Sequence, residues 1–97
     1  MDFVNNAFSL QMLQKDCNLK IKHISKKEFN KAKQKAVSVV GHEETAHILK
    51  LKYNRTDITL CPGDTLYVAQ LVGGRLPEGC TKLPAGYTFK YLKVEVM

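Results

Sequence analysis

The feature that most constrains the fold of this chain is its repeated change from short β-rich runs to helical patterns. The change is sharpest in VVGHEETAH, residues 39–47, where an apolar run stops at a glycine and two glutamates follow one residue later. Acidic side chains in a first helical turn suit the positive end of the helix dipole. The stretch therefore predicts a strand that ends at Gly41 and a helix over 42–53. His42, at the junction, is either a helix-capping residue or a catalytic acid.

The same alternation runs through the rest of the chain. Helical spacing of apolar residues predicts helices over 7–15 and 26–35, the second opened by a capping box at Ser25 and Glu28. Period-two alternation and β-forming residues predict strands at 2–6, 17–25, 36–40, 56–60, 65–72 and 89–96.

The order of these elements indicates the fold class. The strand at 36–40 is expected inside the sheet, and a turn at 61–64 is expected to join 56–60 and 65–72 as a hairpin. We predict an α/β (α+β) fold, a single small domain over 1–97. It has one mixed β-sheet of about five or six strands flanked by short helices.

Charge and cysteine usage narrow the class of protein. Fifteen Lys and Arg against nine Asp and Glu give a formal charge of +6, which favours an anionic partner, although a lysine-rich surface also serves solubility. The three cysteines have no CxxC spacing, so a zinc site or disulfide framework is not expected and a reducing, cytoplasmic setting fits best. There is no signal-peptide pattern, and no apolar run approaches the ~18 residues that a membrane span needs.

Several polar side chains could form an anion site. In GGRLPEG, residues 73–79, glycines let the backbone approach a ligand, Arg75 can hold a phosphate through two N–H groups, and Glu78 follows three residues later. Taken alone, this stretch is more typical of an exposed hairpin loop with a surface Arg–Glu pair. Arg55, in a predicted turn, and the polar groups of NNAFS, residues 5–9, allow the same two interpretations.

Metal and serine chemistry are not expected. No pair of histidines has metal-ligand spacing, and no carboxylate cluster resembles a divalent-metal site. No serine stands in a G-x-S-x-G elbow. We therefore expect neither a metal nor another cofactor.

Four stretches, in this order along the chain, together resemble the viral ring nucleases, small anti-CRISPR proteins that counter type III CRISPR signalling. They are VNNAFSLQML at 4–13, VGHEETAHIL at 40–49, NRTDI at 54–58 with GDTLYV at 63–68, and GRLPEG at 74–79. The resemblance implies a homodimer whose shared cavity binds cyclic tetra-adenylate. It also implies metal-independent cleavage to linear di-adenylate in the cytoplasm of a host cell.

The resemblance also implies roles for individual residues. By motif, His42 is the main catalytic residue and Glu78 a second one. The residues implied as ligand contacts are Arg75, Arg55, Asn6 and Ser9. In this hypothesis the ribose 2′-OH attacks the adjacent phosphorus, His42 protonates the leaving 5′-oxygen, and the arginines offset the phosphate charge.

Two other functions are compatible with the sequence. A non-catalytic relative would sequester the cyclic nucleotide or bind a CRISPR subunit, although such a protein would not need His42, Arg75 and Glu78 together. A small regulator could bind DNA through the lysine-rich helix at 26–35, although no helix-turn-helix spacing accompanies it. We expect no stable DNA binding and no association with a membrane.

Overall fold

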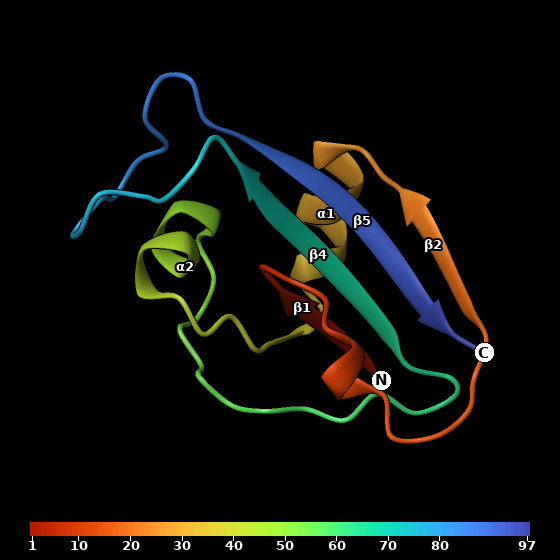
Figure 1. Cartoon of the computed structure of the whole chain (residues 1–97). Coiled ribbons are helices and arrows are strands. Elements are labelled where there is room, and N and C mark those ends of the chain that lie inside the picture. Colours follow the sequence, from red (N-terminus) through yellow and green to blue (C-terminus); the bar gives the residue numbers. More distant parts are fainter.

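The computed structural model describes residues 1–97 as a five-stranded sheet with two α-helices and one short 3₁₀ helix (Figure 1). The strands are β1 (Asp2–Asn5), β2 (Leu19–His23), β3 (Val37–Ser38), β4 (Thr65–Val72) and β5 (Thr88–Val96). The helices are η1 (Leu10–Met12), α1 (Lys26–Lys33) and α2 (Glu43–Leu49).

The sheet is mixed, with the strand order β2-β5-β4-β1-β3. β1 lies parallel to both β3 and β4, whereas β5 lies antiparallel to β4 and β2. β4 and β5 pair along the whole of β4, from Thr65 opposite Glu95 to Val72 opposite Thr88. The predicted fold class, a small α+β domain with one mixed sheet and short helices, is confirmed.

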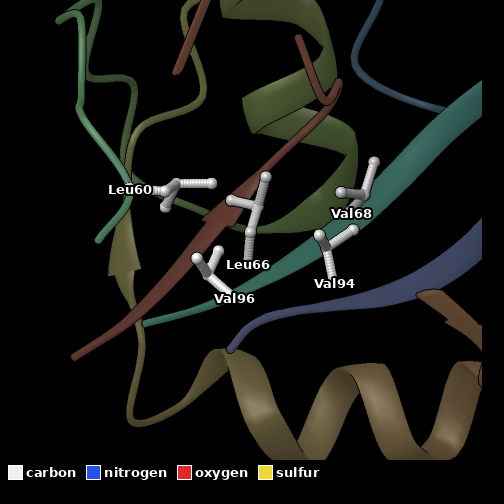
Figure 2. Packing of buried hydrophobic residues seen from close by; sticks show 5 residues of the cluster. All are labelled: Leu60, Leu66, Val68, Val94 and Val96. Carbon is white, nitrogen blue, oxygen red and sulfur yellow. The ribbon is translucent and has the colours of Figure 1, made fainter. Parts of the chain in front are cut away.

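Period-two alternation along β4 gives each face of the sheet its own core. Figure 2 shows the core of one face, which consists of Leu60, Leu66, Val68, Val94 and Val96. The core of the other face consists of Val4, Phe29, Leu49 and Ala69. Helix α1 lies behind β4 and β5 in Figure 1 and places Phe29 in the second core. Each face of the sheet therefore carries a core at the central strands, whereas β2 at one edge is mostly exposed.

The N-terminal helix predicted over 7–15 is reduced to the single turn of η1. The Ser9 hydroxyl caps this turn by accepting a hydrogen bond from the Gln11 N–H at 3.2 Å. Phe8, Met12 and Leu13 pack against the first core, so their helical spacing reflects burial without a regular α-helix.

Two predicted strands differ from the structure. Residues 56–60 form no strand, and only Leu60 makes an isolated parallel bridge, to Leu13. The hairpin partner of β4 is therefore β5, reached through the long loop 73–87. Ile58 and Leu60 still pack on the first core, which explains their strand-like spacing. The strand predicted inside the sheet at 36–40 is the two-residue β3, which lies at the edge beside β1.

The predicted start of α1 agrees with the structure, whereas the predicted end of α2 does not. Ser25 caps α1, as predicted, by accepting from the Glu28 N–H at 3.1 Å. Helix α2 ends at Leu49 instead of residue 53, because Lys50 adopts a left-handed conformation with φ 56° and ψ 45°. The Leu51 N–H then donates to the Ala46 carbonyl at 2.8 Å, which closes the helix in a Schellman-type turn. Neither helix has the length and apolar character needed to cross a lipid bilayer.

Candidate functional site

A pocket of about 920 Å³ opens where the parallel strands β1 and β3 end. After β1 the chain continues to η1, and Met12 packs on the first core. After β3 it continues to α2, and Leu49 belongs to the second core. The two connections thus leave toward opposite faces of the sheet. In sheets with parallel strands, ligands bind in the crevice that such diverging connections create.

The pocket brings together four of the six predicted site residues. Asn6 and Ser9 come from the segment after β1, His42 from the residue before α2, and Arg55 from the segment after α2. Residues 56–59 complete the wall beside Arg55. Three segments that are distant in sequence therefore meet at one site.

His42 is the N-cap residue of α2. Its Nδ1 accepts a hydrogen bond from the Thr45 N–H at 3.3 Å and lies 2.8 Å from Thr45 Oγ1. Thr45 is buried, so these contacts fix the orientation of the imidazole ring. The side chain of His42 is 46% exposed and lines the pocket. With Nδ1 occupied, Nε2 is the ring nitrogen left to contact a ligand.

Arg55 lies against the backbone that precedes His42. A Cβ atom added to Gly41 would be 3.4 Å from Arg55 Cγ, so the absence of a side chain at this position leaves room for the arginine stem. None of the three ion pairs in the structure includes Arg55. Its guanidinium therefore forms no ion pair within the protein and can form the paired N–H contacts that phosphate groups accept.

Arg75 and Glu78, the other two predicted site residues, do not line this pocket. Both are exposed on the loop between β4 and β5, which extends past the end of the sheet near α2 (Figure 1). The loop is held in place, because the Tyr87 hydroxyl donates to the Arg75 carbonyl at 2.9 Å and Leu76 is buried. Gly73 is required in the loop: its φ is 128°, and an added Cβ would lie 3.0 Å from the Gly86 carbonyl oxygen.

Glu44 joins this loop to the start of α2. The Gly79 N–H donates to Glu44 Oε1 at 3.2 Å, and Glu44 Oε2 lies 3.9 Å from His42 Nδ1. Hydrogen bonds from its own backbone N–H and then from that of Gly79 lower the pKa of Glu44, with smaller contributions from His42 and His47. The carboxylate is therefore ionised at neutral pH and anchors the loop beside the histidine.

Several pocket residues were not predicted from the sequence. They are Gln11, Met12, Gln14, Val39, Gly41, Thr56, Asp57, Ile58 and Thr59, whereas Asn5 belongs to the candidate stretch NNAFS. The strand predicted at 56–60 and the helix predicted at 7–15 concealed most of them. The polar run Asn54 to Asp57 is a signal that could have identified the wall, because a buried strand seldom begins with four polar residues.

The pocket offers groups for anion binding and proton transfer. It contains an imidazole, a guanidinium, amides and hydroxyls, together with the carboxylate of Asp57. No group of three or more His, Cys, Asp or Glu side chains in the structure is arranged to hold a metal ion. The side chains themselves could neutralise a phosphate and supply a proton to an oxygen bound to it.

Comparison with known proteins gives a matching family and matches among the solved structures. The model of the STIV B116-like family matches residues 3–85. The fold is similar to that of B116 of Sulfolobus turreted icosahedral virus, with a TM-score of 0.80, 21% sequence identity and 97% of each chain covered. No curated protein matches the chain.

The capping role of His42 can be separated from its exposed nitrogen by two substitutions. Asparagine is a good N-cap and alanine is not, so we expect His42→Ala to lower the free energy of unfolding by about 0.5–2 kcal/mol. We expect His42→Asn to change it by less than about 0.5 kcal/mol. Urea unfolding followed by circular dichroism measures both values, and equal losses for the two variants would contradict the capping role.

The lowered pKa of Glu44 predicts when the loop is released. Because the folded pKa lies below the unfolded value, the stabilising contribution is present above about pH 4.3 and is lost as the pH falls through the folded pKa. We expect the amide shift of Gly79, followed by NMR, to titrate with a midpoint below about pH 4.3, the ordinary glutamate value. The same titration should be absent in Glu44→Gln. A midpoint above the ordinary glutamate value would contradict this assignment.

Proposed function

This chain belongs to the STIV B116-like family, and we propose that it is a metal-independent ring nuclease that cleaves cyclic tetra-adenylate to linear di-adenylate. In a cell, this activity would suppress type III CRISPR immunity. The observation that supports the proposal most is the pocket that holds His42 and Arg55 at the end of β1 and β3. The sequence resemblance to viral ring nucleases supplies the substrate class, and the fold shared with a viral protein is compatible with a viral origin.

In the proposed reaction the RNA supplies its own nucleophile. The ribose 2′-hydroxyl loses its proton to water, and its oxygen bonds to the adjacent phosphorus. The bond from phosphorus to the 5′-oxygen breaks, and a 2′,3′-cyclic phosphate forms. His42 donates a proton to the departing 5′-oxygen, and Arg55 offsets the negative charge that develops on the phosphorane. Positioning and fixed charges of this kind supply much of the rate enhancement in phosphoryl transfer.

Thr45 suits a histidine that must change its protonation state. While Nδ1 carries no proton, it accepts the hydrogen bond from the Thr45 N–H. In the imidazolium, and in the neutral ring that remains after Nε2 has given up its proton, Nδ1–H can donate to Thr45 Oγ1, which lies 2.8 Å away. The ring can therefore keep its orientation in both states while Nε2 exchanges a proton with the ligand. We propose Thr45 as a positioning residue in this function.

We also propose that two copies of the chain form the complete site. A ring of four identical nucleotides has a symmetry that fits a two-fold cavity with one His42 from each subunit. The pocket of about 920 Å³ is at the upper end of the range for small-molecule sites, about 300–1,000 Å³, and a cyclic tetranucleotide is larger than such ligands. Arg75 and Glu78 lie on an anchored, exposed loop beside α2, where they are available to a ligand shared by two subunits.

A cleavage assay in the presence of EDTA tests the proposal. We expect the protein to convert labelled cyclic tetra-adenylate to linear di-adenylate, separated by thin-layer chromatography. His42→Asn keeps the helix cap, so we expect the rate to fall by about 10²–10⁴-fold without loss of folding. Lys15→Asn is the control, because Lys15 is exposed and lines neither this pocket nor the other groove.

Three outcomes of this assay would contradict the proposal. A ring that is bound but left intact would identify the protein as one that sequesters the messenger. Cleavage that stops in EDTA and returns with a divalent cation would exclude the metal-independent reaction. Full activity in His42→Asn would exclude the imidazole as the proton donor.

A further inference from the structure

A second groove, with a volume of about 700 Å³, lies between α1, the C-terminal end of α2 and the loop that precedes β5. It shares no residue with the pocket at β1 and β3. Its four lysines come from three segments and are Lys26, Lys33, Lys50 and Lys82, with His47 beside them. No Asp or Glu lines the groove, and none of the three ion pairs includes one of these lysines.

Lys33 is close enough to Lys50 and Lys26 for their charges to oppose its own. Lys33 is partly buried, and its Nζ donates to the Leu49 carbonyl at 2.8 Å, which fixes it at the end of α2. Burial first, and then the charges of Lys50 and Lys26, lower the pKa of Lys33. An anion in the groove would relieve this repulsion, and the protein itself provides no carboxylate there to do so.

Lys50 occupies a backbone conformation that its side chain disfavours. It is the only non-glycine residue with a positive φ, and the left-handed conformation is much less favourable for lysine than for glycine. Glycine or asparagine is the usual residue at this position after a helix. A lysine near the last helix carbonyls gains some stabilisation from the helix dipole. An unfavourable backbone conformation of this kind also suggests a functional reason for the residue that adopts it.

We propose that this groove binds a phosphorylated small molecule of nucleotide size. Converging lysines provide point charges for phosphate groups. The apolar and aromatic parts of the wall, Leu83, Phe89 and Tyr91, provide a surface for a less polar moiety such as a base. The volume falls within the range of small-ligand sites, about 300–1,000 Å³. The lysine side chains converge on one groove, whereas binding of a nucleic-acid strand requires a row of positive charges that follows the phosphate backbone of the strand.

Titration with ATP in EDTA, followed by ¹H–¹⁵N NMR, tests the proposal. We expect shift changes in α1, at 47–50 and at 81–91. We expect Lys50→Gly to weaken ATP binding about tenfold, because one hydrogen bond between charged groups is lost. The same substitution should raise the Tm, because glycine adopts the left-handed conformation more readily than lysine does. Lys82→Gln, on the opposite wall, should also weaken binding. Lys15→Asn, the matched control for one lost charge, should bind like the wild type.

ATP affinity and Tm, measured on the same variants, distinguish a binding role of the lysines from a purely structural role. Unchanged ATP affinity in Lys50→Gly together with a higher Tm would overturn the proposal. Shift changes confined to the pocket around His42 would overturn it as well. Binding of an RNA or DNA strand without binding of ATP would also overturn it and would identify the groove as a nucleic-acid surface. The proposal does not depend on the ring nuclease activity, because the two sites share no residue.

Discussion

The contact between His42 Nδ1 and Thr45 is the interaction on which the first site depends. A helix that begins at Glu43 has free backbone N–H groups, and the imidazole satisfies one of them. This use of one ring nitrogen for folding fixes the ring and leaves the other nitrogen at the pocket. Asparagine, serine or aspartate would cap the helix equally well but could not supply an imidazole proton. Under the proposed function, the pocket accounts for the choice of histidine, because the helix alone does not require one.

The sheet topology determines where this histidine lies. Because β1 and β3 are parallel neighbours and their connections leave toward opposite faces, the residues after both strands border the same crevice. The loop after β4 is held to the start of α2 through Glu44, so its exposed Arg75 and Glu78 are placed on the histidine side of the molecule. Part of the excess of basic residues is also gathered at the two sites. Arg55 at one site and the four lysines at the other form no ion pair. Asp57 also lines the first site, whereas no carboxylate lines the groove that holds the four lysines.

Local signals predicted where the two α-helices begin better than how the strands pair. The cap at Ser25 and the junction at His42 depend on neighbouring residues, and the structure contains both. The segment 56–60 has the spacing of a strand because Ile58 and Leu60 are buried, yet burial in a loop gives the same pattern. The early end of α2 has no sequence signal, since lysine is not a residue that normally stops a helix. The meeting of Asn6, Ser9, His42 and Arg55 agrees with motif resemblance, whereas composition and spacing alone could not have placed Arg55 beside His42.

The chemistry of the cleaved ends tests most directly the claim that His42 assists attack by the ribose of the substrate itself. Phosphorus NMR and mass spectrometry of the first product, made in EDTA and in water enriched in ¹⁸O, identify the group left at each cut. We predict a 2′,3′-cyclic phosphate and a free 5′-hydroxyl, with no ¹⁸O incorporated at that stage. A 5′-phosphate with a free 3′-hydroxyl, or ¹⁸O in the first product, would show that water is the nucleophile and would contradict the proposed role of this site.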